Sequence, residues 1–465
     1  MKLRPGYDVI VVGGGTAGAI AGIAAARTGA RTLVVEQYGS LGGVLTLGMS
    51  LKGVWDGQGR KALGGIGEEL IEGARAMDGA TDVAHHPRHG SVMGQDPEAV
   101  KLKLLEMVGT SGVHLLLHSF LIDALMEKSG IQAIRVANKA GIEIIPAKCF
   151  VDCTGDGDLA ARSGAAFWRG RESDQAMQPV SAIFRVGGVD LDQTWAYLEE
   201  HPEDFEAPDG QVGGEYTVGK FRNVPGTGAA GFKNLIRKAR EAGDYHIPRD
   251  DMGFNPMPGR REVTINLTRV HGVDGTDPDD LTRAEIESQL QTLEGVRFLR
   301  KYVPGFRDCY VVSSPFQVGI RETRHIQGAY VLTGDDVRQG RDFHDQVARG
   351  AYPLDIHDVG KDDKESQSKV DGGGTDLSKI NRSYGIPARC LVPLGIDNLT
   401  VAGRTLSATH AAAASARGQP VCMATGHAAG TIAAMSAIKD IPPSQLSIAD
   451  VRDVLRKQKA VIDLE

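Results

Sequence analysis

The apolar and polar positions of the first 36 residues follow a pattern that changes period along the chain. Two short apolar runs flank a glycine-rich turn and an alanine-rich stretch, and an acidic residue ends the second run. Short apolar runs bounded by glycine or charge are typical of buried strands, whereas alanine favours helix. The predicted elements are a strand over Val9–Val12, a turn with Gly13, Gly15 and Gly18, a helix over Ala19–Arg27 and a strand over Thr32–Val35. The chain therefore opens with a strand–turn–helix–strand unit between Asp8 and Glu36.

Later apolar patterns predict further elements, separated by more polar stretches. Residues 55–95 are expected to be irregular, and residues 360–374, rich in Lys, Asp, Ser and Gly, are expected to form a flexible loop that acts as a lid. The other predicted elements are a helix over Asp96–Val108, a strand over Val113–Leu117, a meander through Ile134 and Ile142–Ile145, a strand ending at Thr154 and Gly155 before a helix capped by Asp156 and Asp158, strands over Val263–Leu267 and Tyr310–Ser313, a helix over Arg283–Val303, a strand over Leu399–Ala402, then a loop, and a helix from Pro420 through Ala433.

The glycine turn of the first unit has the spacing of a dinucleotide-binding site. Gly13, Gly15 and Gly18 follow the G-x-G-x-x-G pattern, which gives a tight turn, room for a pyrophosphate and close helix–strand packing. The helix N-terminus then offers N–H groups and positive dipole to the phosphates. Glu36, 18 residues after Gly18, ends the next strand, where a carboxylate accepts hydrogen bonds from ribose hydroxyls and repels a 2′-phosphate. FAD or NAD(H) is therefore expected rather than NADP(H).

Two later segments favour FAD. Gly42 and Gly43 form a second glycine loop, suited to run beside the pyrophosphate and ribityl chain, with Val44–Leu47 passing along the flavin ring. Near the C-terminus a strand ends at Gly403, and the helix opened by Pro420 is rich in small residues, so its N-terminal dipole is expected to stabilise the charge of a reduced flavin. An NAD dehydrogenase has no need of this C-terminal return to the first unit.

Composition narrows the class of protein further. A chain of 465 residues is expected to form two or three lobes, and its net charge of −7 gives no basic footprint for nucleic acid or an anionic membrane.

No uninterrupted apolar run reaches the length of a membrane span, and no signal peptide is expected before the first strand. Five scattered cysteines suit a reducing compartment, and Cys149 and Cys153, about 13 Å apart along a strand, are too distant for a disulfide. A cytoplasmic location is expected.

Polar residues in the middle of the chain are the candidates for contact with a substrate. Arg321, Arg324, His325 and His357 lie in the segments GIRETRH and AYPLDIHD. His410 follows the strand that ends at Gly403. The cluster His85, His86 and His89 lacks Cys or acidic partners at ligand spacing, so no metal is expected there, and a solvent-exposed or substrate-facing loop is favoured.

Taken together, these segments resemble the bacterial FAD-dependent oxidoreductases with a glutathione-reductase-type Rossmann fold. The motifs that carry the resemblance are DxTGDGDLA at Asp152–Ala160, GIRExR at Gly319–Arg324 and VAGR…SATH…CMATGxAAG at Val401–Gly430. The resemblance implies an FAD site on these segments, and His427 stands where the family often has Gln. The residues expected to bind FAD are Gly13, Gly15, Thr16, Ala17, Gly18, Glu36, Gln37, Gly42, Gly43, Val44, Thr154, Gly155, Gly403, Arg404, Ala424 and Thr425.

The expected architecture is α/β: a two-segment Rossmann-like FAD-binding domain over residues 1–165 and 381–440, an inserted α+β substrate domain over 166–380, and a C-terminal helix over 441–465. The expected activity is hydride transfer from a C–OH or C–N group of a small polar substrate to flavin, with His410 or His357 as base and Arg321 holding the substrate. Two alternatives are reduction of an unsaturated substrate and a flavin electron-transfer subunit that needs a partner. The electron acceptor (O2 or a carrier) and a homo-oligomeric state are left open.

Overall fold

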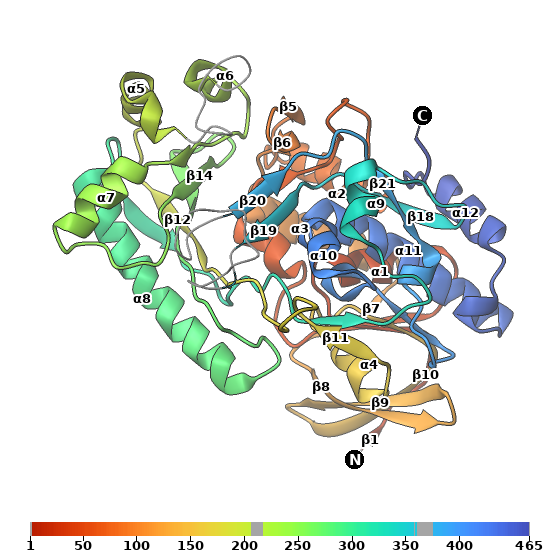
Figure 1. The fold of residues 1–465 in the computed structure, drawn as a ribbon. Helices are drawn as coiled ribbons and strands as arrows, with labels where there is room; N and C mark the ends of the chain where they lie inside the picture. The colour runs from red at the N-terminus through yellow and green to blue at the C-terminus, as the bar shows by residue number, and fades with distance from the viewer. Residues whose placement is uncertain (1, 206–216, 358, 360–374, 465) are drawn as a thin grey trace.

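A mixed sheet of eight strands forms the centre of the fold (Figure 1). The computed structural model describes residues 2–205, 217–357, 359 and 375–464. In spatial order the sheet contains β7 (His114–Leu116), β3 (Thr32–Val35), β2 (Tyr7–Val12), β10 (Gly141–Asp152), β9 (Gly130–Asn138) and β8 (Phe120–Glu127), and both β1 (Lys2–Leu3) and β22 (Leu399–Val401) pair with β10. Five neighbouring strands of this sheet run parallel to one another: β7, β3, β2, β10 and β22. The chain is therefore a mixed α/β protein with a parallel sheet.

Strand β10 joins the parallel and antiparallel parts of this sheet. Its first half pairs antiparallel with β9, and its second half lies between β2 and β22 in parallel register. Asp152, its last residue, is level with Val12 and Val401. The carboxyl ends of three parallel strands thus meet at one edge, which is where α/β sheets bind ligands.

Helix α1 (Thr16–Arg27) follows β2 and packs against the long helix α11 (Gln419–Lys439). A Cβ atom on Gly426 or Gly430 would lie 2.2 Å from the carbonyl oxygen of Ala17 or Ala21, so only glycine allows this close contact. α11 is long and apolar enough to cross a membrane, but 89% of its most apolar window is buried inside the protein, as in the core helix of a folded domain. The small residues of α11 therefore serve helix packing.

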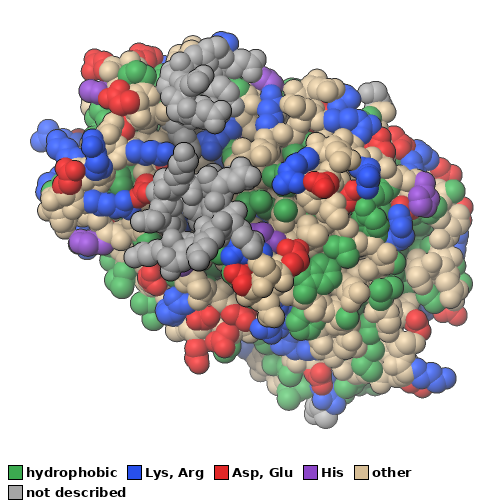
Figure 2. Space-filling model, viewed as in Figure 1, with side chains coloured by type: hydrophobic (Ala, Val, Ile, Leu, Met, Phe, Trp, Pro, Cys, Tyr) green, Lys and Arg blue, Asp and Glu red, His purple; other side chains and the backbone are tan. Residues whose placement is uncertain are grey.

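A second, antiparallel sheet of five strands has a hydrophobic core of its own (Figure 1). Its strands, in spatial order, are β13 (Ala230–Gly231), β14 (Met252–Pro256), β15 (Glu262–Asn266), β12 (Ile183–Gly187) and β16 (Tyr310–Ser313). Its helices are α5 (Leu191–Glu200), α6 (Val218–Arg222), α7 (Lys233–Glu241) and α8 (Pro278–Tyr302). α7 buries Ile236 and Ala239 and exposes its basic residues, visible as the blue group over α7 in Figure 2.

The remaining elements connect or cover these two sheets. They are η1 (Gly43–Leu47), β4 (Leu51–Lys52), α2 (Ile66–Arg75), β5 (Ala84–His86), β6 (Gly90–Met93), α3 (Pro97–Thr110), α4 (Asp158–Arg162), β11 (Phe167–Arg169), η2 (Pro202–Asp204), β17 (Arg324–Ile326), α9 (Gly334–Gln339), β18 (Gln346–Gly350), β19 (Leu354–His357), β20 (Thr375–Ser378), β21 (Tyr384–Pro387), η4 (Ala388–Cys390), η5 (Gly403–Thr405), α10 (His410–Ala416), η6 (Pro443–Gln445) and α12 (Ile448–Lys457).

The first unit is confirmed, and so are the helices α3, α8 and α11 and the strands β7, β15, β16 and β22 to within a few residues. Three expectations are wrong. Residues 55–95 contain α2 and the strands β5 and β6, which form a small sheet with β4. The helix forms because Ile66, Leu70, Ile71 and Ala74 bury one helical face despite the surrounding glycines. The loop expected before α11 contains α10, built almost wholly of alanine.

The third correction concerns the start of α4. Gly157 precedes this helix and no side chain caps it, so neither Asp156 nor Asp158 does so. The buried carboxylate of Asp152 accepts a hydrogen bond from the N–H of Ala160 instead, at 2.8 Å. The expected domain boundaries and the inserted substrate domain stay predictions, and the predicted lid over 360–374 lies outside the described residues.

Candidate active site

The glycine turn after β2 is tightly packed against the end of β10. Gly13 has φ +92°, and a Cβ there would lie 2.4 Å from the carbonyl oxygen of Cys153. A Cβ on Gly18 would lie 1.7 Å from the carbonyl oxygen of Gly13. Gly15 caps α1 without a side-chain hydrogen bond, and a Cβ there would meet nothing closer than 4.0 Å. The first turn of α1 therefore faces open space with uncapped N–H groups.

Glu36 lies at the end of β3, beside this turn. Its buried carboxylate accepts hydrogen bonds from the N–H of Gly14 at 2.6 Å and from the N–H of Tyr38 at 2.8 Å. Burial raises the pKa of this carboxyl above its ordinary value, although the backbone hydrogen bonds oppose the shift. Each carboxylate oxygen has room for a further donor, which a ribose hydroxyl provides.

The second glycine loop, at Gly42 and Gly43, is hydrogen-bonded to the first, at Gly13–Gly15. Gly42 donates its N–H to the carbonyl oxygen of Gly14 at 2.9 Å, and the hydroxyl of Thr16 donates to the carbonyl oxygen of Gly42 at 3.0 Å. A Cβ on Gly43 would lie 3.1 Å from the Cα of Gly15. Two loops of backbone thus run side by side at the N-terminus of α1.

The C-terminal segment returns to the same edge after β22. The N–H of Gly403 donates to the hydroxyl of Thr425 at 3.2 Å. Arg404 donates from Nη2 to Asp156 at 2.9 Å, while its Nη1 is buried without a hydrogen-bond partner among the described residues. An unpaired buried donor is costly, so this nitrogen marks a place for an acceptor.

One cavity of about 420 Å³ joins these glycine loops to the five-stranded sheet. Of the residues expected to bind FAD, twelve line it: Gly13, Gly15, Thr16, Ala17, Glu36, Gln37, Gly43, Val44, Thr154, Gly155, Gly403 and Arg404. Gly18, Gly42, Ala424 and Thr425 lie outside the lining. Gly18 and Gly42 support it through the packing and hydrogen bonds given above, and Thr425 does so through Gly403.

The far wall of the cavity carries a buried polar group centred on Asp355. Its Oδ2 accepts hydrogen bonds from the Tyr352 hydroxyl at 2.7 Å and from Arg417 at 3.2 Å. Its Oδ1 lies 3.4 Å from Nε2 of His357. Arg269 lies 3.2 Å from Nδ1 of His357, and because arginine only donates, this contact leaves the proton on Nε2, facing Asp355.

Charges around these groups move their pKa values strongly. Burial followed by the charge of Arg321 lowers the pKa of His357 well below its ordinary value, so the ring is neutral at pH 7. His357 and nearby donors hold the pKa of Asp355 well below its ordinary value against the effect of burial. At pH 7 the wall therefore carries a neutral imidazole beside an ionised carboxylate.

The structure does not bring all the predicted substrate residues together. Arg321 and His357 line the cavity, whereas His410, Arg324 and His325 do not. His410 donates from Nδ1 to the carboxylate of Glu322 at 2.8 Å, and His325 donates from Nε2 to the same carboxylate at 2.9 Å. Arg324 binds Asp158 at 3.0 Å. These three residues form the support behind the cavity wall.

The histidine cluster divides between the cavity and the surface. His86 and His89 line the cavity with their Nδ1 atoms 3.1 Å apart, while His85 is exposed. Burial, and then the charge of Lys52, lowers the pKa of His86 to about 3. In the described part of the chain, no group of three or more His, Cys, Asp or Glu residues is placed to hold a metal ion. His86 and His89 are therefore neutral parts of the cavity lining.

Sequence reasoning missed several residues of the wall: Tyr352, Asp355, Arg417, Arg249 and Asp251. For Asp355 a signal existed, because it stands two residues before His357 in a strand, where alternate side chains share a face. Arg417 stands two residues before α11. Arg249 and Asp251 lie in a polar stretch that no motif singles out.

The fold and site define a protein that binds a dinucleotide at the carboxyl ends of a parallel sheet. A sequence model of the family described as FAD dependent oxidoreductase matches residues 8–455, and the chain belongs to this family. It is an enzyme, and FAD is its cofactor. The described residues fit FAD: Gly15 leaves the N-terminus of α1 open, Glu36 faces the ribose position, and Arg404 has an unpaired donor.

Individual relatives are more distant. The chain is 24% identical, over 289 residues, to digeranylgeranylglycerophospholipid reductase 1 of Methanococcoides burtonii, covering 57% of this chain and 66% of the relative, just under two thirds of its length. Among solved structures, a geranylgeranyl bacteriochlorophyll reductase-like protein of Thermoplasma acidophilum has 12% identity and a TM-score of 0.49, covering 99% of this chain and 84% of that one. p-Nitrophenol 4-monooxygenase of Pseudomonas putida has 11% identity and a TM-score of 0.46, covering 98% and 84%.

Proposed function

We propose that this enzyme oxidises a C–OH or C–N group of a small polar substrate, using FAD as hydride acceptor. The observation that carries the proposal is the continuous cavity, which places the neutral His357 and its partner Asp355 opposite the glycine loops. A substrate between the two halves would have its C–H toward the cofactor side and its O–H or N–H toward His357. When bound, FAD supplies the hydride acceptor of this chemistry.

The cofactor is held by the loops at the edge of the parallel sheet. The uncapped N-terminus of α1 would hold the pyrophosphate, and Glu36 would accept hydrogen bonds from the ribose hydroxyls. Gly43 and Val44, which line the same cavity, would contact the remainder of the cofactor. Arg404 would donate its unpaired Nη1 to an oxygen of FAD.

His357 would accept on Nδ1 the proton that the substrate loses, once the substrate O–H or N–H replaces Arg269 as the donor to this atom. The carboxylate of Asp355 stabilises the imidazolium that forms, and the hydrogen bonds from Tyr352 and Arg417 keep that carboxylate in place. A positioned base of this kind contributes about 10²- to 10⁴-fold to rate. His410 lies outside the cavity lining, so it is not part of this proposal.

The cavity lining combines apolar side chains, such as Leu47, Met49 and Phe254, with charged ones, such as Arg249, Arg321 and Asp355. The charged groups favour a substrate with a polar or ionised part, because desolvating them against an alkyl chain is costly.

The test is anaerobic reduction of the purified holoenzyme by panels of hydroxy acids, sugars and amines, followed at the flavin absorbance band. One compound class should bleach the band in a single turnover. His357→Gln should slow that bleaching about 10²-fold or more, whereas the matched control His344→Gln, on the exposed surface, should leave it unchanged. Equal rates in wild type and His357→Gln would remove His357 as the base.

Reduction of an unsaturated substrate is the second candidate, and it is favoured by the similarity to a curated reductase. In this direction a protonated group on the wall would give a proton to the carbon beside the one that receives hydride. The test is reoxidation: enzyme reduced chemically without oxygen is mixed with unsaturated acids. Recovery of the oxidised flavin spectrum, with no bleaching by any reduced compound, would establish this direction in place of the first.

A further inference from the structure

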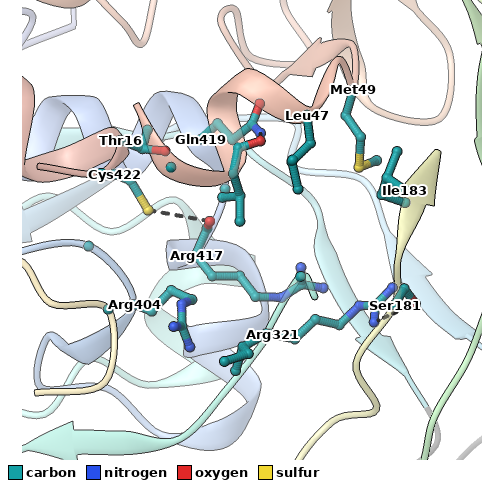
Figure 3. A pocket seen from close by; sticks show the side chains of 18 of the residues that line it. Thr16, Leu47, Met49, Ser181, Ile183, Arg321, Arg404, Arg417, Gln419 and Cys422 are labelled. Carbon is teal, nitrogen blue, oxygen red and sulfur yellow. Dashed lines mark hydrogen bonds between the residues drawn. The ribbon is translucent and has the colours of Figure 1, made fainter. Parts of the chain in front are cut away.

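We propose that the substrate carries a carboxylate, bound by the guanidinium groups of Arg321 and Arg417 on the far wall of the cavity. This inference rests on the proposed function, since it assigns the substrate class of the same site. It is carried by the placement and bonding of these two side chains, which project into one part of the cavity opposite Leu47 and Met49 (Figure 3).

Arg321 has only neutral hydrogen-bond partners. Its Nη1 donates to the hydroxyl of Ser181 at 3.0 Å and to the carbonyl oxygen of Pro179. Among the described residues no carboxylate forms an ion pair with it. These two bonds fix the side chain against the segment that precedes β12 and leave the rest of the guanidinium facing the cavity. A partly buried guanidinium held in place without an ion-paired carboxylate among the described residues is suited to bind an anion.

Arg417 approaches the same space from the turn between α10 and α11. Its Nη2 donates to the backbone carbonyl oxygen of Asp355 at 2.8 Å and to its side chain at 3.2 Å. Its Nε is buried and has no hydrogen-bond partner in the described part of the chain. Since Asp355 also accepts from Tyr352, its charge is shared among several donors. Arg417 therefore has donor capacity that the described protein groups do not use.

Other guanidinium groups lie near Arg321. Arg249 and Arg417 line the same cavity, together with the carboxylates of Asp251 and Asp355. Burial, and then the guanidiniums of Arg417, Arg269 and Arg249, lower the pKa of Arg321 well below its ordinary value, while Asp355 opposes the shift. Because arginine stays protonated, that shift expresses the cost of burying a cation beside other cations, which Asp355 offsets only in part. A bound anion removes this cost.

A carboxylate matches the site better than a phosphate. Arg321 contributes one positive charge without an ion pair among the described residues, and a carboxylate supplies one negative charge, whereas a phosphate monoester supplies nearly two. Guanidinium groups also bind a planar carboxylate through two parallel N–H donors. The predicted substrate is thus a 2-hydroxy or 2-amino acid, or a related acid with its reacting carbon near the carboxylate.

Binding can be tested without turnover. The holoenzyme is titrated with acetate, glycolate, succinate and benzoate, with the amide of each, and with inorganic phosphate, while the flavin spectrum is recorded. At least one carboxylate should perturb the spectrum saturably, its amide should not, and phosphate should bind more weakly. Absence of any carboxylate effect, or an equal effect of the amide, would overturn the inference. Tighter binding of phosphate would also overturn it, in favour of a phosphorylated substrate.

Substitution of Arg321 tests whether this side chain binds the carboxylate. Arg321→Gln should weaken the best carboxylate about 10- to 100-fold, and Arg321→Lys should weaken it less, since both keep polar contacts but only lysine keeps the charge. The exposed control Arg338→Gln should change nothing. FAD content and thermal midpoint must match wild type in each variant, and Arg321→Lys serves if the glutamine variant fails to fold. Unchanged affinity in both Arg321 variants would overturn the assignment.

The outcomes separate this inference from the proposed function. If acids bleach the flavin, the Arg321 variants should raise KM more than they lower kcat. If neutral alcohols or amines bleach it equally well in wild type and variants, the carboxylate subsite is overturned while the oxidation stands. If carboxylates bind but no compound bleaches the flavin, the subsite stands and the direction of the reaction is wrong.

Discussion

The two halves of the cavity are built in different ways. The cofactor half comes mainly from one continuous stretch, residues 8–47, and consists largely of backbone. A Cβ atom added to Gly13, Gly18 or Gly43 would lie within 3.1 Å of a main-chain atom. The substrate half consists of side chains from separate segments, such as Arg249, Asp355 and Arg417. The structure of the cofactor half is determined by the local sequence of one segment. The structure of the substrate half is determined by the tertiary packing of segments that are distant in sequence.

This difference predicts different consequences of substitution. In the cofactor half a single added carbon displaces backbone, so the fold and FAD binding fail together. In the substrate half a lost charge leaves the sheet and the glycine loops intact, so FAD stays bound while the rate falls. The predictions below test this separation.

The largest effect is expected at Gly18. Valine there would place Cβ 1.7 Å from the carbonyl oxygen of Gly13 and 2.9 Å from Cβ of Cys153, so α1 must move away from β2. Gly18→Val should remove most bound FAD and cost at least about 3 kcal/mol of the free energy of unfolding. The measurements are the ratio of flavin to protein absorbance and urea unfolding.

The matched control for Gly18 is Gly109 in α3, where an added Cβ would meet nothing within 4 Å. Gly109→Ala should leave FAD content unchanged and stabilise the protein by about 0.5–1 kcal/mol through helix propensity. Full FAD content in Gly18→Val would contradict the close packing of α1 on the glycine turn.

Substitution of Asp355 tests the substrate half of the cavity. Asparagine keeps the shape but removes the charge that faces His357 and Arg417, so the imidazolium formed on His357 loses its partner. Asp355→Asn should lower the single-turnover rate of flavin reduction about 10²- to 10³-fold with FAD content unchanged. Asp335→Asn, on an exposed carboxylate of α9, is the control. Loss of FAD in Asp355→Asn would show that the two halves are not separable.

The third prediction concerns the support of the substrate half. Glu322 is buried, and the hydrogen bonds from His325 and His410 hold its pKa at about 2 against the effect of burial. Because the folded pKa is depressed, Glu322 stabilises the protein above its ordinary value of 4.5, and this contribution disappears as the pH falls toward 2. Glu322→Gln should cost about 3 kcal/mol at pH 7. Urea unfolding at a series of pH values below 4.5 should show the difference from wild type narrowing as the pH falls toward 2, and a constant difference would assign the cost to packing.

The cofactor half could be predicted from the sequence because its determinants are neighbours in the chain. The spacings are fixed along the chain for Gly13, Gly15, Gly18 and Glu36. Because these residues lie in one strand–turn–helix–strand unit, only one arrangement of that unit brings them together. The same local reasoning failed for α2 and α10, whose glycine and alanine content hides their helical faces. In those helices the intrinsic helix propensity of the residues does not determine the structure, and tertiary packing does.

The substrate half could be predicted only in part. His357 and Arg321 were recognised as polar groups in unusual segments, but nothing local states that Arg417, 60 residues after His357, reaches the carboxylate of Asp355. His410 has the residue type of a base and the right neighbours in sequence, yet it contacts Glu322 behind the wall. A residue type suggests chemistry, and only the fold decides which side of a wall the residue faces.

The smallest effect is expected at Glu36, and it separates cofactor binding from stability within the cofactor half. Glutamine keeps one acceptor oxygen, but its NH₂ group cannot accept a hydrogen bond from a ribose hydroxyl, so one acceptor for the cofactor is lost. Glu36→Gln should therefore weaken FAD binding to the apoprotein about 10-fold, or 1.4 kcal/mol. In the apoprotein two effects oppose each other at pH 7, because the variant removes a buried charge but turns an NH₂ group toward one of the two backbone donors, Gly14 or Tyr38, so its free energy of unfolding should change less than its free energy of FAD binding. Calorimetric titration with FAD should also show wild-type affinity falling as the pH drops toward the raised pKa, while the variant's affinity stays constant. Glu106→Gln, on the exposed face of α3, is the control, and equal pH dependence in Glu36→Gln and wild type would exclude Glu36 as the acceptor for the ribose.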